Sequence, residues 1–157
     1  FKQTLVLFGK AATYPAEVRW IGHKKGNDAV FTGKDALEKA EKFLSANTPH
    51  QKMVIFYDVD CTKPINSRNN NLIIYCPART TNAKYRSGIE HLLIVPDNFD
   101  TSSNTFIETK KSGDKTTTLP NKKAIKDYVF SLSKDKQKEW LTRINNILDE
   151  IKTNFLT

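Results

Sequence analysis

Two aspartates follow directly after an apolar run in the middle of the chain. Met53–Tyr57 is continuously apolar, and Asp58-Val59-Asp60 comes next. Side chains two residues apart on an extended chain point the same way, so both carboxylates are expected on one side. Carboxylate oxygens suit Mg²⁺ or Mn²⁺, which neutralises phosphate charge and activates water. The pair predicts a metal site for phosphate chemistry at the carboxyl end of a strand, although an acidic turn gives the same pattern.

Further candidates lie on either side of this pair. Asp35 follows Thr32-Gly-Lys, so it either completes a capping box at a helix start or joins the metal site. Lys84, Arg86 and Glu90 are close together around a glycine, which lets the backbone approach a ligand. The two cations are candidates to stabilise the charge that develops on a phosphoryl group, with a solvated helix face as the alternative.

The elements that must position these residues are typical of an α/β fold. Ala36–Leu44 carries apolar residues at helical spacing, and Lys52–Tyr57 and Asn71–Cys76 are continuous apolar runs, as in strands covered on both faces. The remaining pattern predicts short strands at Thr4–Phe8 and Glu17–Ile21, a mobile solvent-facing loop at Thr62–Asn70, a helix or strand at Ile89–Val95, a hairpin around Ser112-Gly-Asp114, and helices at Lys122–Leu132 and Lys134–Phe155.

Composition limits the function classes. The 157 residues fit one domain, and no apolar stretch is long enough for a membrane span. Cys61 and Cys76 lack metal-ligand spacing and indicate free thiols in a reducing, cytoplasmic compartment. A net charge of +8 makes a nucleic-acid partner plausible. The histidines show no zinc spacing and are interpreted as surface or satisfied residues: His23, His50 and His91. The lysines of the hairpin and the following helix either contact a nucleic-acid backbone or keep the protein soluble: Lys110, Lys111, Lys115, Lys122, Lys123 and Lys126.

The order of these pieces resembles the Toprim domain of the OLD family, in which a nuclease domain follows an ABC-type ATPase domain. The resemblance covers roughly residues 22 to 132, and its most specific part is the segment Arg86-Ser-Gly-Ile-Glu-His-Leu-Leu93. It implies a Toprim-like Rossmannoid sheet flanked by helices, with a small hairpin and two C-terminal helices. Residues 1–157 would then be a single domain, a C-terminal fragment excised from a longer ATPase-nuclease.

The resemblance also implies an activity and its residues. Asp58 and Asp60 would bind Mg²⁺ or Mn²⁺, Asp35 would complete the metal site, and Lys84 or Arg86 would contact the scissile phosphate, with Glu90 in the same machinery. The partners would be nucleic acid, DNA rather than RNA, and the ATPase domain of the same chain, with oligomers formed through the missing region and a role in phage defence. Toprim domains open with a strand that carries a glutamate, and residues 4–10 have none. The glutamate is therefore expected upstream of Phe1, or the domain is inactive.

Two alternatives stay open. Asp58-Val-Asp60-Cys-Thr62 fits the first motif of the haloacid-dehalogenase phosphatases, with Asp58 as nucleophile, Asp60 as acid/base and Asp97 to Asp100 as the distal acidic motif. The motif stands late in the chain for that family, and few residues separate Asp60 from Asp97. The other alternative is a basic nucleic-acid-binding module without catalysis, in which the acidic pair is structural.

Overall fold

The computed structural model describes residues 1–19, 21–25, 28–61, 63, 66–69, 71–81 and 83–156. Its contacts divide the chain into two compact units. Unit 1 contains Phe1–Ala11 and Thr80–Asn146, and unit 2 contains Ala12–Arg79 and the residues from Ile147 onward. The predicted mixed α/β fold class is confirmed. The single-domain assignment stays a prediction.

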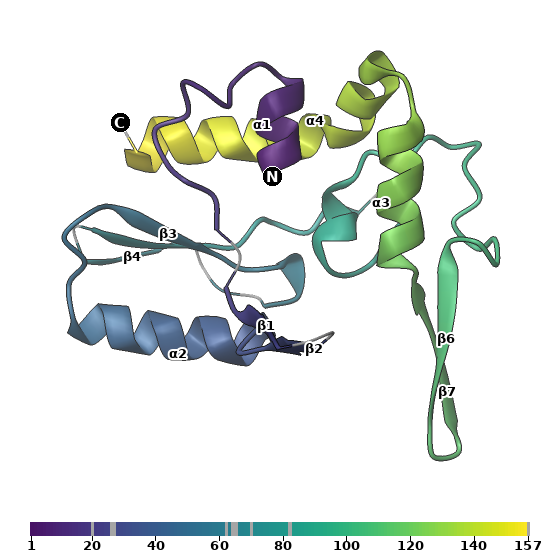
Figure 1. Ribbon diagram of the computed structural model, residues 1–157, viewed down its shortest axis with the longest axis horizontal. Helices are drawn as coiled ribbons and strands as arrows, with labels where there is room; N and C mark the ends of the chain where they lie inside the picture. Colours follow the sequence, from purple (N-terminus) through teal and green to yellow (C-terminus); the bar gives the residue numbers. More distant parts are fainter. Residues whose placement is uncertain are drawn as a thin grey trace. The chain divides into compact units, whose positions relative to one another are not determined.

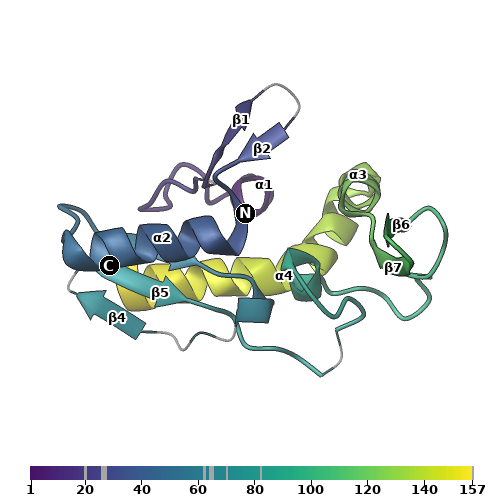
Figure 2. The same cartoon turned by 90° about the horizontal axis from the view of Figure 1, so that it is seen from below.

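Unit 2 is built on a three-stranded sheet with the order β3-β5-β4. Strand β3 (Met53–Phe56) runs parallel to β5 (Leu72–Tyr75), with Met53 opposite Leu72 and Phe56 opposite Tyr75. Both strands lie within the two apolar runs, which confirms those predictions. Helix α2 (Gly33–Ala46) precedes β3 and lies along the sheet, as Figure 2 shows.

Alternating side chains of the sheet contact different neighbours. One face forms a core of Ile55, Tyr57, Leu72, Ile74 and Cys76, against which Leu37, Ala40 and Leu44 of α2 pack. On the other face Phe56 stacks on Tyr75 with ring centroids 5.5 Å apart. The Tyr75 ring also meets Phe155, and its hydroxyl donates to Glu150 at 3.0 Å. Every residue of β5 is buried, as expected for a strand covered on both faces.

The predicted loop at Thr62–Asn70 is wrong in its centre. Asn66–Asn69 forms strand β4, which pairs antiparallel with β5. An edge strand is held by its backbone and needs no apolar side chains, so a polar sequence gives no signal for it. Thr62, Pro64, Ile65 and Asn70 lie outside the described residues.

The N-terminal predictions are also corrected. The apolar run predicted as a strand at Thr4–Phe8 is mostly helix α1 (Lys2–Leu7), because a short apolar run also serves as the buried side of one helical turn. The described part of Glu17–Ile21 is not a strand, and Trp20 lies outside the described residues. A separate, unpredicted hairpin follows, formed by β1 (His23–Lys25) and β2 (Asp28–Val30).

Unit 1 contains the predicted hairpin and helices. Strands β6 (Ile107–Ser112) and β7 (Lys115–Pro120) form a two-stranded ribbon, followed by α3 (Lys122–Ser131) and α4 (Lys134–Ile151) (Figure 1). Residues of α4 from Ile147 onward and the π-helical turn η3 (Lys152–Leu156) belong to unit 2. Phe99, Phe106, Tyr128 and Trp140 form an aromatic cluster with centroids 4.7–5.7 Å apart. Ile89–Leu92, predicted as helix or strand, is the 3-10 helix η2.

Candidate functional site

The carboxyl ends of β3 and β5 lie side by side because the two strands are parallel. Tyr57 extends the pairing past β3 by donating its N–H to the Tyr75 carbonyl at 2.8 Å. Just beyond, the Cys76 thiol donates to the carbonyl of Asp58 at 3.3 Å. The segment after β3, which holds the two aspartates, is therefore fixed against the segment after β5. This edge of an α/β sheet is where ligands bind in open parallel sheets.

Asp58 and Asp60 both have exposed side chains at this edge, but the chain between them is not extended. Val59–Cys61 forms the 3-10 helix η1, closed by a hydrogen bond from the Cys61 N–H to the Asp58 carbonyl at 3.0 Å. The premise that alternation along a strand aligns the two carboxylates is therefore wrong. A 3-10 helix has three residues per turn, so residues two apart point in different directions.

Arg79 is a functional candidate that sequence reasoning missed. Its guanidinium Nη2 donates to Asp60 Oδ1 at 3.0 Å, and its Nε donates to the Val59 carbonyl at 3.4 Å. The ion pair is exposed, with 59% and 40% of the two side chains accessible, so it contributes little stability and is open to exchange. In the sequence, the signal for Arg79 was a cation three residues after the end of the second apolar run, Asn71–Cys76.

The start of α2 lies near the same edge. Asp35 is exposed in the first turn of α2. The charge of the neighbouring Lys34 acts to lower the pKa of the Cys61 thiol at the end of η1. The pKa of that thiol is nonetheless raised, first by burial and then by Cys76. Asp35 is thus close in sequence to a residue whose charge reaches the Asp58–Cys61 segment. Thr32 occupies the N-cap, but its side chain makes no capping hydrogen bond within the described residues, so the Thr32 half of the predicted capping box is not formed.

A buried polar network lies beneath this edge. The Tyr57 hydroxyl donates to Glu41 Oε2 at 2.8 Å, and Lys63 Nζ donates to the same oxygen at 2.6 Å. Lys63 also lies 4.4 Å from the Tyr57 ring centroid. Burial and the Glu41 hydrogen bond raise the pKa of Tyr57 strongly. The network ties Lys63, two residues after η1, to Glu41 of α2, and isolated polar residues in the sequence gave no sign of it.

The donor set at the edge fits a hard divalent cation better than a soft one. Asp58 and Asp60 supply carboxylate oxygens, and both are accessible to water, which Mg²⁺ keeps as ligands. In the part of the chain that the structure describes, no group of three or more His, Cys, Asp or Glu side chains is placed to hold a metal ion. A cation at this edge would therefore rely on fewer than three such side chains, with Asp58 and Asp60 as the candidates and water as the other ligands.

Glu90 belongs to unit 1 and is buried, with 8% of its side chain accessible. Lys122 Nζ lies 3.3 Å from Glu90 Oε2, but this oxygen has no hydrogen-bond partner of good geometry among the described residues. Gly88 has a φ of +69°, and a Cβ there would approach Glu90 Oε2 to 2.6 Å. Glycine is therefore required at this position both for the positive φ and for the space beside the buried Glu90 carboxylate.

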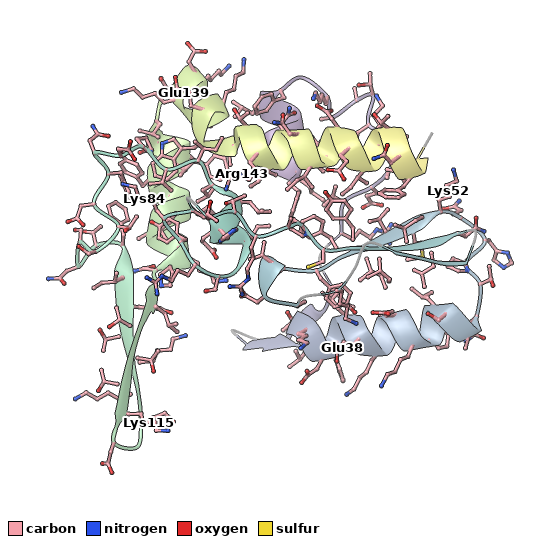
Figure 3. The ribbon with its side chains drawn as sticks, turned by 180° about the vertical axis from the view of Figure 1, so that it is seen from behind. Glu38, Lys52, Lys84, Lys115, Glu139 and Arg143 are labelled. Carbon is pink, nitrogen blue, oxygen red and sulfur yellow. The ribbon has the colours of Figure 1, made fainter. Side chains whose placement is uncertain are left out.

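The other two candidates of this segment are at the surface of unit 1. Lys84 donates to the Asp97 carbonyl at 2.8 Å and lies 3.9 Å from the Asp97 carboxylate; Figure 3 labels it. Arg86 is exposed, with no hydrogen bond or ion pair among the described residues. Lys84, Arg86 and Glu90 thus lie in unit 1, while Asp35, Asp58 and Asp60 lie in unit 2. Their union in one site stays a prediction.

His91 is fully used by the fold. Its Nδ1 donates to the Tyr85 carbonyl at 2.9 Å, and its Nε2 accepts the Thr80 N–H at 2.9 Å. These two contacts tie η2 to Thr80 and Tyr85, so His91 is a satisfied residue. His50 is exposed, and the side chain of His23 lies outside the described residues.

Comparisons with protein-family models, with curated proteins and with solved structures find no match to this chain. Across the described residues, none of the helices combines the length and the apolar character that crossing a membrane requires.

Proposed function

We propose that this chain is a Toprim-like domain of an OLD-type ATPase-nuclease and takes part in metal-dependent cleavage of phosphodiester bonds in DNA. The observation that supports it most is the position of Asp58 and Asp60, both exposed, directly after the carboxyl end of β3 beside its parallel neighbour β5. The net charge of +8 is consistent with a polyanionic substrate.

Each residue has a distinct role in this proposal. Asp58 and Asp60, with Asp35, would hold Mg²⁺ or Mn²⁺, which would polarise the phosphate and activate water. Arg79 pairs with Asp60 at 3.0 Å, and its guanidinium would be able to contact a phosphate oxygen if it released that carboxylate. Lys84, Arg86 and Glu90 lie in unit 1, and the phosphate contact that the resemblance implies for them stays a prediction.

A second candidate, the non-catalytic nucleic-acid-binding module, is favoured by the same ion pair. A metal ligand that already has an arginine partner loses that partner before it binds a cation, which weakens the site. If Arg79 and Asp60 form a permanent structural pair, the acidic turn has no role in catalysis and the basic surface alone binds nucleic acid.

The deciding experiment incubates supercoiled plasmid with the longer ATPase-nuclease that the proposal implies, in Mn²⁺, Mg²⁺ or EDTA. Metal-dependent nicking is expected, and Asp58→Asn or Asp60→Asn should abolish it because each removes a metal ligand. Asp35→Asn is tested in the same assay, with Asp135→Asn as its matched control. Both acids are exposed in the first turn of a helix, and Asp135 lies in unit 1. The control is expected to keep full activity.

Calorimetric titration with Mn²⁺ separates the alternatives. The nuclease proposal expects binding that Asp58→Asn removes and that Arg79→Gln tightens, because Arg79 competes for Asp60. Hydrolysis of a simple aryl phosphate, lost with Asp58→Asn and without any plasmid nicking, would favour the haloacid-dehalogenase-like phosphatase. Salt-sensitive DNA binding with neither activity and no Mn²⁺ binding would leave the non-catalytic module.

A further inference from the structure

The ribbon β6–β7 is exposed over most of its length. Every residue from Thr109 to Thr118 is exposed, and Figure 1 shows the two strands extending away from α3. Gly113 and Asp114 form the two-residue turn, with Gly113 at a φ of +58°. The exposed part contains lysine, threonine, serine, glycine and aspartate, so no apolar core explains its length.

The two faces of the ribbon differ. Lys110 is opposite Thr117 and Lys115 is opposite Ser112, and cross-strand partners share a face. Glu108, Lys110 and Leu119 are on this face, and all three line a cavity of about 280 Å³ together with Lys122 and Lys123. The opposite face carries Lys111 with three threonines: Thr109, Thr116 and Thr118.

The face of Lys110 and Lys115 therefore continues into a basic surface at the start of α3. Lys110 and Lys115 are diagonal neighbours, about 7–8 Å apart at the backbone. Lys115 has no ion-pair partner among the described residues and lies near the tip, as labelled in Figure 3. Lys110 pairs with Glu108 at 3.1 Å and Lys123 with Asp127 at 2.8 Å, but these lysines are 65% and 85% accessible. Such exposed pairs are weak and exchange readily for phosphates.

We propose that this face of the ribbon, Lys110 and Lys115 with Lys122 and Lys123 at its base, binds the phosphate backbone of duplex DNA. A two-stranded ribbon fits the major groove of B-form DNA, whereas the major groove of A-form RNA is too narrow and deep for it. The exposed part, Thr109–Thr118, has no aromatic side chain on which single-stranded bases could stack. The inference rests on the proposed function for its ligand class, nucleic acid, but it requires neither a metal nor cleavage.

The test measures binding of a fluorescent DNA duplex by anisotropy in EDTA at several salt concentrations. Lys110→Ala and Lys115→Ala are expected to weaken binding and to lower the slope of log K against log salt by about one each. Lys111→Ala is the matched control, because it removes the same charge from the next residue on the opposite face. It should leave the slope unchanged, while Glu108→Gln should tighten binding by removing an anion from the binding face.

Three results would overturn the inference. They are equal losses for Lys110→Ala and Lys111→Ala, tighter binding of a single strand than of the duplex, and no salt-dependent binding at all. Circular dichroism of each variant shows that the fold is intact. Binding is measured in EDTA, where metal-dependent cleavage does not occur, so a failure of the nuclease proposal and a failure of the ribbon proposal give different results.

Discussion

At the scale of single residues, two buried tyrosine hydroxyls have opposite surroundings. The Tyr57 hydroxyl donates to Glu41 and accepts from Lys63 at 3.3 Å. The Tyr85 hydroxyl has no hydrogen-bond partner among the described residues. Burial, followed by the nearby charge of Glu90, raises the pKa of Tyr85 to about 12. The same side chain thus makes different contributions to stability at the two positions.

Replacing each of these tyrosines with phenylalanine should therefore have different effects at pH 7. Tyr57→Phe loses a buried hydrogen bond to a carboxylate and should lower the free energy of unfolding by about 1.5–3 kcal/mol. Tyr85→Phe removes a hydroxyl without a partner and should change it by less than about 1 kcal/mol. Urea denaturation followed by circular dichroism measures both, and an equal loss would contradict the assigned surroundings.

The stability of the unmodified chain should also fall at high pH because of Tyr85. A tyrosine in the unfolded chain ionises near pH 10, whereas folded Tyr85 keeps its proton up to about pH 12. The raised pKa means that the contribution of Tyr85 is complete below pH 10 and is lost as pH rises toward 12. Tyr85→Phe should unfold with a shallower pH dependence than the unmodified chain across this window. Parallel pH dependences in urea denaturation would show that Tyr85 does not titrate as described.

At the scale of elements, the N-caps of α2 and α3 differ in whether the side chain makes a capping hydrogen bond. The Asn121 side chain accepts the Ala124 N–H at 3.1 Å at the start of α3, whereas Thr32 makes no such bond within the described residues. Asn121→Ala should destabilise the chain by about 1 kcal/mol, and Thr32→Ala by clearly less. Thermal unfolding followed by circular dichroism compares them, and a larger effect of Thr32→Ala would contradict the cap geometry.

At the scale of the whole molecule, α4 belongs to both compact units. The helix runs without interruption from Lys134 to Ile151, and the boundary between the units falls after Asn146. Asn146 is exposed, so its side chain has little effect on packing. The backbone of α4 is thus one continuous element shared by the two units.

Asn146→Pro should test this continuity. Proline removes a helical hydrogen bond and clashes with the preceding turn, which costs about 3 kcal/mol or more. The expected result is a lower midpoint of unfolding than in the unmodified chain. The unfolding transitions followed by tryptophan fluorescence and by circular dichroism should not coincide. Asn146→Ala is the control and should unfold in one transition near that of the unmodified chain. Identical unfolding of the two variants would mean that α4 is not continuous at the boundary.

The sequence alone determined the elements whose signal is local. The apolar runs at β3 and β5, the stripe of α2, the turn at Gly113 and the two C-terminal helices were all predicted, because hydrophobic period and turn residues are properties of short segments. The positions of Asp58 and Asp60 after β3 followed from the same pattern.

The tertiary structure alone decided what depends on distant partners. The polar strand β4 exists because β5 offers a free edge, and Asp60 meets Arg79 because the two parallel strands end together. Glu90, predicted from sequence only as a carboxylate near a glycine, is buried beside Lys122 of α3. Burial and pairing arise from residues far apart in the chain, so no pattern within a short segment specifies them.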